Sequence, residues 1–135
     1  SMLEIEDGDR VVDLGCGDGQ FLVHGARKTG AKFTGIELNW LLFMISRLKV
    51  FARALSGRVT VQRSDYMRVP LSQFNKVFMF NMPSCLKVLV PKLEKELQVG
   101  TRVLSVVFPF SSKKFKLLET GGTKTYRLFL YERVD

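Results

Sequence analysis

The stretch Val11-Val12-Asp13-Leu14-Gly15-Cys16-Gly17-Asp18-Gly19 decides the fold class of this chain. A short apolar run that ends in three closely spaced glycines is typical of a buried strand followed by a tight turn. We therefore expect a strand over residues 10–14 and a helix from residue 20 to about residue 29. In α/β folds such a turn lies at the carboxyl edge of the sheet, where ligands bind.

The rest of the chain alternates short apolar runs with helical patterns, which predicts an α/β fold around a mostly parallel sheet. Further strands are expected over residues 31–37, 58–63, 75–81 and 101–108. Asn39 is a suitable N-cap for a helix that runs to about residue 55. Its apolar side chains recur at helical spacing at Leu41, Ile45, Leu48, Ala52 and Leu55.

Proline and glycine mark the expected elements of the second half. Pro91 suits the first turn of a helix that passes through Leu97 and stops at Gly100. Residues 114–120 and 124–131 flank Gly121-Gly122, which predicts an antiparallel hairpin. The complete pattern predicts one domain over residues 2–135, with a seven-strand sheet in which one strand is reversed.

Composition limits the classes of function. The chain has 135 residues, 46% of them hydrophobic, and a formal net charge of +8, which suits nucleic acid, an anionic membrane surface or an acidic protein as partner. Cys16, Cys85 and the single His24 lack the spacing of a zinc site, so we expect no metal. Unpaired cysteines favour a reducing, intracellular compartment, either cytoplasmic or mitochondrial.

The charge of the glycine turn indicates its ligand. Asp13 and Asp18 bracket the turn, and two carboxylates repel a pyrophosphate. The third glycine also falls one position too early for a dinucleotide fingerprint. S-adenosylmethionine carries an ammonium and a sulfonium group, both cationic, and fits this acidic turn. The alternative is a strand-to-helix turn whose Asp only starts the helix.

Two further segments supply groups for a nucleoside. Glu37 ends the second expected strand, 20 residues after Gly17, where an acidic residue accepts the ribose hydroxyls. In Ser64-Asp65-Tyr66, Asp65 is placed to accept the adenine amino group, while Leu38 or Tyr66 packs on the ring. A loop Asp that caps its own turn is the alternative. With Asn81, the predicted cofactor-binding residues are Asp13, Gly15, Cys16, Gly17, Asp18, Gly19, Glu37, Leu38, Ser64, Asp65, Tyr66 and Asn81.

The acceptor side of the site is predicted after the fourth and fifth strands. Asn81-Met82-Pro83-Ser84 stands where amino methyltransferases of nucleic-acid bases carry Asn/Asp-Pro-Pro-aromatic. Met82 and Ser84 depart from that pattern, which disfavours a flipped base. Phe108, in Phe108-Pro109-Phe110, is a candidate wall for a narrow channel or a core residue. Asn81, Pro83 and Phe108 are therefore the predicted catalytic residues, and Asn81 is expected to orient the acceptor amine.

These motifs resemble those of the small seven-strand class I protein lysine methyltransferases. That group includes an archaeal broad-specificity enzyme and the mitochondrial enzymes that modify adenine nucleotide translocase and the c-ring protein of ATP synthase. The resemblance rests on residues 13–19, 36–39, 91–97 with 100–103, and 108–110. It implies a Rossmann-like fold, S-adenosylmethionine as cofactor and a protein lysine as acceptor. Members of the group carry a covering segment before the first strand, and we expect that segment to be missing here.

Two other functions remain open at the level of sequence. The basic charge is compatible with an RNA or DNA amino-methyltransferase. A cofactor-binding partner protein without catalytic activity is the alternative that is not an enzyme.

Overall fold

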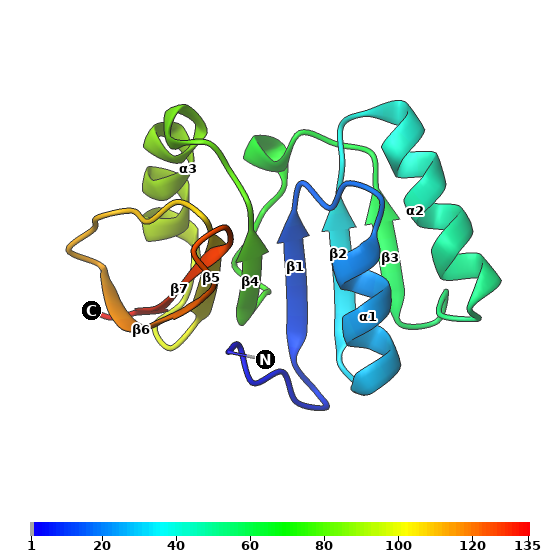
Figure 1. The fold of residues 1–135 in the computed structure, drawn as a ribbon, viewed down its shortest axis with the longest axis horizontal. Coiled ribbons are helices and arrows are strands. Elements are labelled where there is room, and N and C mark those ends of the chain that lie inside the picture. Colours follow the sequence, from blue (N-terminus) through cyan, green and yellow to red (C-terminus); the bar gives the residue numbers. More distant parts are fainter. Residues whose placement is uncertain (1) are drawn as a thin grey trace.

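The computed structural model describes residues 2–135 and contains one seven-stranded sheet (Figure 1). The strand order is β3-β2-β1-β4-β5-β7-β6. All neighbouring pairs from β3 to β5 are parallel, and β7 is antiparallel to both β5 and β6. The bounds are β1 Arg10–Leu14, β2 Lys32–Ile36, β3 Val59–Gln62, β4 Lys76–Met79, β5 Arg102–Val106, β6 Phe115–Gly122 and β7 Arg127–Arg133. The predicted mostly parallel sheet with one reversed strand is confirmed.

The helices cover the sheet as two separate groups. α1 (Gln20–Lys28) and α2 (Trp40–Ala52) pack with β1, β2 and β3 around one apolar cluster. α3 (Pro83–Glu96) packs against the sheet in a second and larger cluster. A short 3-10 turn, η1 (Tyr66–Arg68), follows β3. Asn39 caps α2 as predicted, because its side chain accepts a hydrogen bond from the Leu42 N–H at 3.1 Å.

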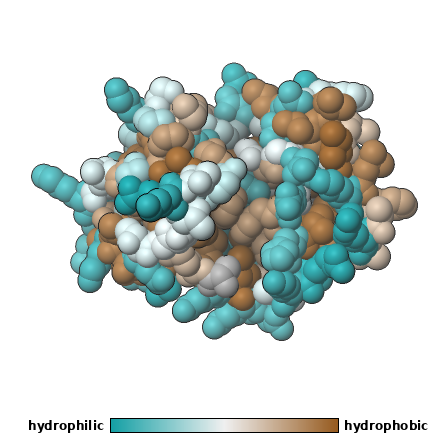
Figure 2. Space-filling view, in the orientation of Figure 1, coloured by the Kyte–Doolittle hydropathy of each residue, from teal (hydrophilic) through white to brown (hydrophobic). Residues whose placement is uncertain are grey.

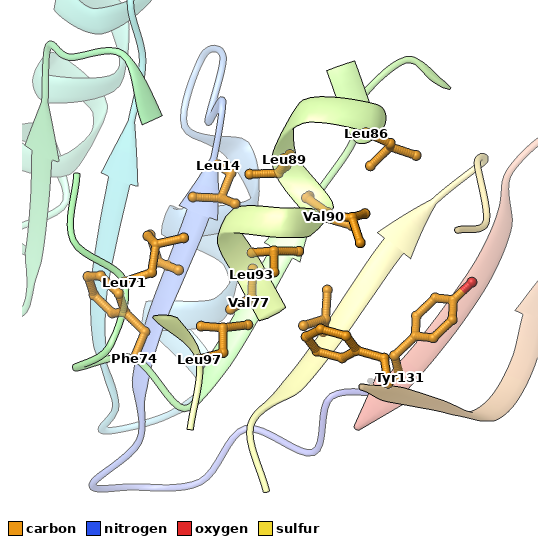
Figure 3. Close-up of a cluster of buried hydrophobic side chains, with 14 of the residues drawn as sticks. Leu14, Leu71, Phe74, Val77, Leu86, Leu89, Val90, Leu93, Leu97 and Tyr131 are labelled. Carbon is orange, nitrogen blue, oxygen red and sulfur yellow. The ribbon is translucent and has the colours of Figure 1, made fainter. Parts of the chain in front are cut away.

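The larger cluster anchors α3 to the middle of the sheet (Figure 3). Leu86, Leu89, Val90 and Leu93 recur at helical spacing and are all buried. They meet buried side chains of β1, β4 and β7 and of the loop after η1, among them Leu14, Leu71, Phe74, Val77 and Tyr131. This packing fixes the end of β4, where Asn81 lies, relative to β1.

The start of α3 corrects one prediction. The helix begins at Pro83, eight residues before the predicted start, and Pro91 lies inside it. Proline is well suited to the first helical position, and Pro83 takes that role here. Pro91 is tolerated because it lies on the exposed side, where water can satisfy the carbonyl that its missing N–H leaves free.

The hairpin also turns at a different place from the predicted one. Gly121 and Gly122 belong to β6 and pair with Leu128 and Arg127 of β7. The turn consists of residues 123–126, and the Thr123 hydroxyl closes it by accepting the Tyr126 N–H at 3.1 Å. The Thr123 N–H in turn donates to the Tyr126 carbonyl at 3.0 Å.

The apolar pattern of α2 gives a third correction. Ser46 and Val50 are its buried residues, while Leu41 and Leu48 of the predicted apolar face are exposed. α2 lies at the β3 end of the sheet, so only one side of it has a protein surface to cover (Figure 1). Helical spacing therefore identified the helix but not its buried side.

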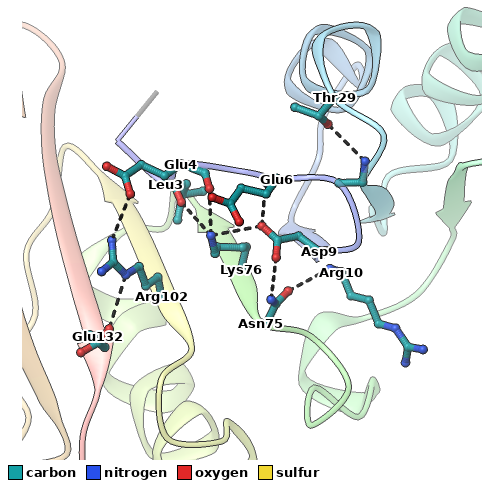
Figure 4. A network of polar contacts seen from close by, with 11 residues as sticks. Leu3, Glu4, Glu6, Asp9, Arg10, Thr29, Asn75, Lys76, Arg102 and Glu132 are labelled. Atoms are coloured by element: carbon teal, nitrogen blue, oxygen red, sulfur yellow. Dashed lines mark hydrogen bonds and ion pairs between the residues drawn. The ribbon is translucent and has the colours of Figure 1, made fainter.

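The amino-terminal segment is tied to the end of the sheet opposite the glycine turn (Figure 4). Lys76 donates hydrogen bonds to the Leu3 and Glu4 carbonyls at 3.0 Å and pairs with Asp9 at 3.1 Å. Burial alone would raise the pKa of Asp9, but hydrogen bonds from Glu6, Asn75 and Lys76 outweigh it and lower that pKa. Leu3 is fully buried against Leu104 and Leu130.

Candidate active site

The glycine turn leaves its backbone open on one side. Gly15, Gly17 and Gly19 have φ angles of 85°, 57° and 81°, which L side chains rarely adopt. A Cβ atom at Gly15 or Gly17 would meet nothing within 4 Å, so a ligand can approach the chain closely there. At Gly19 the added atom would lie 3.1 Å from Ser46, which shows that this glycine serves the packing of α1 on α2.

Asp13 carries a buried carboxyl group at the base of the turn. Its side chain is 3% exposed, and burial together with the nearby charge of Glu37 raises its pKa to about 8. No hydrogen bond contributes to that shift. A cation at this position would restore the ionised form, because it replaces the solvation that burial removes.

Asp18, the second acid of the turn, is already paired. Its carboxylate accepts a hydrogen bond from the Lys49 ammonium at 3.0 Å and another from the Gln20 N–H at 3.2 Å. The Lys49 hydrogen bond is the main cause that lowers the pKa of Asp18. Asp18 therefore ties α1 to α2, and Asp13 is the acid that has no cationic partner of this kind.

Glu37 joins the ends of β1 and β2. One carboxylate oxygen accepts the Gly17 N–H at 2.8 Å, and the other accepts the Asn39 N–H at 3.0 Å. Each oxygen has a second lone pair for a further donor. The two bonds hold the carboxylate beside the glycine turn, where the ribose-binding acid is predicted.

A cavity of about 220 Å³ gathers the predicted nucleoside-binding residues. Six of them line it together with Ile36: Gly15, Glu37, Leu38, Ser64, Asp65 and Tyr66. Leu38 is 61% exposed and forms an apolar wall at the mouth. Asp65 also caps η1, since one carboxylate oxygen accepts the Met67 N–H at 2.9 Å. Turn capping and contact with the cavity thus coexist at this residue.

Asn81 follows β4 and is 8% exposed. Its amide nitrogen donates to the Tyr66 hydroxyl at 3.1 Å, and within residues 2–135 its amide oxygen, also buried, has no partner. Burial and the neighbouring Cys85 raise the pKa of the Tyr66 phenol, so its hydroxyl stays protonated at neutral pH. An unsatisfied buried acceptor is costly and suits a ligand that brings an N–H donor.

The other two predicted catalytic residues lie apart from this cavity. Pro83 lines a groove of about 400 Å³ with Pro109 and Phe110, between α3 and the segment after β5. Phe108 follows a tight turn at Val107, whose φ of 72° is rare for a β-branched residue. The Phe108 N–H donates to the Val106 carbonyl at 2.9 Å, which makes this a γ-turn with positive φ. Strained backbone of this kind is concentrated at functional sites.

Two side chains differ from, or were missed by, the sequence prediction. The Cys16 side chain points into the core, and burial followed by the nearby Asp13 charge raises its pKa to about 12. Only its backbone faces the turn. Ser46 of α2 supports the turn from behind by donating to the Gly17 carbonyl at 2.6 Å. A lone serine among the apolar residues of α2 is the sequence signal that would have identified it.

The chemistry of the site fits S-adenosylmethionine and offers no metal centre. Asp13 provides a buried negative charge for an ammonium group, Glu37 faces the position of a ribose, and the Leu38–Tyr66 cavity is partly apolar. Within the described part of the chain, no three His, Cys, Asp or Glu side chains are grouped so that they could hold a metal ion.

Comparison with known families places this site in context. Residues 13–116 match the model of the ANTKMT methyltransferase domain. A protein-lysine N-methyltransferase of Saccharolobus islandicus is 32% identical over 136 residues, covering 96% of this chain and 84% of that protein. The human lysine N-methyltransferase of the ATP synthase c-ring protein is 36% identical over 74% of this chain. The mouse adenine nucleotide translocase lysine N-methyltransferase is 36% identical over 91% of it.

The chain spans 42% of the human relative and 53% of the mouse one. Among solved structures, an RNA methyltransferase from Salinibacter ruber in complex with S-adenosyl-L-homocysteine superposes with a TM-score of 0.93. It is 24% identical and the match covers 99% of this chain and 86% of that one. The Rossmann-like class I methyltransferase fold is therefore confirmed, with the antiparallel carboxyl-terminal hairpin.

Proposed function

This chain belongs to the family of ANTKMT methyltransferase domains, and from that premise we propose that it methylates the ε-amine of a protein lysine. The cofactor is S-adenosylmethionine, which supplies a methyl group on a cationic sulfonium. The observation that carries the choice of an amine is the buried amide oxygen of Asn81, which has no partner among the described residues and lies at the end of β4.

Each end of the cofactor has its own residues. The Asp13 carboxylate holds the α-ammonium group, while the open backbone of Gly15 and Gly17 lets the methionine part lie close to the chain. Glu37 accepts the ribose hydroxyls with the lone pairs that its backbone hydrogen bonds leave free. Asp65 and Leu38 hold the adenine ring at the cavity. These roles orient the methyl group toward β4.

The lysine amine is positioned by β4 and the segment after β5. The Asn81 amide oxygen accepts one N–H of the amine and directs its lone pair toward the methyl group. Phe108 forms an apolar wall that excludes water from the amine. The amine must be neutral to attack, and the Tyr66 hydroxyl, kept protonated by its raised pKa, is not the base that accepts its proton. The proton therefore leaves to water before transfer.

A nucleic acid is the alternative acceptor, and the net charge of +8 is the observation that favours it. Against it, Met82 and Ser84 provide no aromatic platform for a base next to Asn81. We weight the chemistry beside Asn81 above overall charge, since a basic surface also suits acidic proteins. A cytoplasmic or mitochondrial location remains a prediction.

The deciding experiment uses methyl-labelled S-adenosylmethionine and a cell extract. After incubation with the protein, one aliquot is treated with nuclease and another with protease. Label that survives nuclease and maps to lysine by mass spectrometry supports the proposal. Label that disappears with nuclease would assign a nucleic-acid acceptor, and cofactor binding without any transfer would favour the non-catalytic partner protein.

A further inference from the structure

α2 has an inverted distribution of side chains. Its buried positions include Ser46, while four large apolar residues are exposed: Trp40 by 57%, Leu41 by 63%, Leu48 by 61% and Phe51 by 75%. With 3.6 residues per turn, the side of α2 opposite Ser46 and Val50 carries only apolar side chains. These residues, here termed the outer face of α2, are Trp40, Leu41, Met44, Ile45, Leu48, Phe51 and Ala52.

Cations border the outer face on both sides. Arg47 lies along one border, over the Phe43 ring at 5.6 Å, and lines a hollow with Met44 and Phe51. On the other border Lys49 and Arg53 line a groove of about 630 Å³ between α1 and α2. Arg27 and Lys28 of α1 line the same groove. In Figure 2 brown side chains gather over α2 at the upper right, with teal side chains beside them over α1.

We propose that the outer face of α2 binds an anionic phospholipid membrane, with the basic groove between α1 and α2 receiving the lipid phosphates. An apolar helical face with a tryptophan and phenylalanine, bordered by Lys and Arg, is the arrangement that lies in a lipid–water interface. Within residues 2–135 no helix is long and apolar enough to cross a membrane. The contact is therefore one of a helix lying along the surface.

The charges favour lipid over other occupants of this face. A second copy of the chain would bring Arg47, Lys49 and Arg53 against the same cations. A nucleic acid would use the cations but leave the outer face exposed. A bilayer interface accepts both the apolar face and the cations at once. The inference is independent of the acceptor proposed above, since membrane binding needs neither cofactor nor lysine.

Trp40 is the only tryptophan of the chain and lies in the outer face, so its fluorescence reports directly on this contact. The protein is mixed with vesicles of phosphatidylcholine alone or of phosphatidylcholine with phosphatidylglycerol. We expect sedimentation with the anionic vesicles, a blue shift of Trp40 emission, and quenching by lipids that carry bromine on their acyl chains. Vesicle binding without shift or quenching would overturn the proposal.

Paired variants separate the outer face from general stickiness. Leu48→Ser with Phe51→Ser should weaken vesicle binding about tenfold or more. Val88→Ser with Val99→Ser, which removes apolar side chains 58% and 65% exposed elsewhere, should leave it unchanged. Lys28→Gln with Arg53→Gln should weaken binding to anionic vesicles several-fold, whereas Lys95→Gln with Lys113→Gln, equal in charge, should not. Circular dichroism and cofactor binding verify that each variant is folded.

Three results would assign the face to something else. Equal losses in the test and control pairs would mean that no particular surface binds lipid. A dimer in solution that Leu48→Ser with Phe51→Ser converts to monomer would assign the outer face to a second copy. An RNA oligonucleotide that shifts Trp40 emission when vesicles do not would assign it to nucleic acid.

Discussion

At the scale of single residues, Asp13 connects the burial of a carboxyl group to ligand charge. Its pKa of about 8 means that the site takes up a negative charge as pH rises through that value. The affinity for S-adenosylmethionine should therefore increase with pH, by up to roughly tenfold per pH unit below 8, and Asp13→Asn should abolish this dependence. Titration calorimetry at pH values on either side of 8 measures both.

The matched ligand is methylthioadenosine, which keeps the nucleoside and sulfur but lacks the ammonium group. Its affinity should change little with pH or with Asp13→Asn. Without ligand, the raised pKa acts on stability in a defined direction: the contribution is present below the ordinary value of 3.8 and is lost as pH rises toward 8. Asp13→Asn should thus be more stable than the parent chain near pH 8, and a less stable variant would contradict the assigned burial.

Asn81 provides a second test at the residue scale. Asn81→Ala removes the amide oxygen proposed to accept the acceptor amine and should lower kcat by roughly 10–100-fold. Tyr66→Phe removes only the hydroxyl that holds the amide nitrogen at 3.1 Å, so its effect should be several-fold smaller. Steady-state kinetics on the labelled lysine substrate compares the two. A larger loss in Tyr66→Phe would assign the main role to the phenol.

At the scale of elements, Gly35 allows α1 and the glycine turn to pack closely on β2. A Cβ atom at Gly35 would lie 2.3 Å from Leu22 Cδ1 and 2.9 Å from Cys16 Sγ, and both side chains are buried. Gly35→Ala should therefore destabilise the fold by about 1–3 kcal/mol. Gly57→Ala is the control, because nothing lies within 4 Å of its added atom and its φ is not positive. Urea unfolding that affects both variants equally would refute this account.

Elements whose neighbours in sequence are also their neighbours in space were predictable. β1 occupies the predicted residues 10–14, and α1 and α2 start where their glycine and Asn39 signals indicate. The start of α3 was not, because two prolines, Pro83 and Pro91, both suit a first turn and only the buried row from Leu86 to Leu93 decides between them. The buried side of α2 depends on its position at the end of the sheet, which its own sequence does not encode.

The candidate site divides in the same way. Residues at strand ends, such as Glu37 and Asp65, could be placed because parallel strands bring their carboxyl ends to one edge. The pairing of Asp18 with Lys49, 31 residues later, could not, because it depends on how α2 crosses α1. Likewise, the partner of Asn81 is Tyr66, from a different strand end.

At the scale of the whole molecule, the sheet separates two binding functions along its carboxyl edge. The cavity at the ends of β1, β2 and β3 holds the cofactor, and the ends of β4 and β5 hold the acceptor. Glu37→Gln should raise KM for S-adenosylmethionine about tenfold, since it weakens charge-assisted hydrogen bonds, with little change in KM for the protein substrate. Phe108→Ala should do the reverse. Initial rates with each substrate varied in turn test this, and parallel changes in both constants would contradict a divided edge.

The two backbone hydrogen bonds to Glu37 also bear on how quickly the site recognises its ligand. Gly17 and Asn39 have already restricted the rotamers of this side chain in the free protein, so recognition of a ribose forfeits little side-chain entropy. A preorganised carboxylate of this kind needs no rearrangement before capture. Association of the nucleoside part should therefore be a single fast step without a slow conformational phase, and weaker affinity in Glu37 variants should arise from faster dissociation.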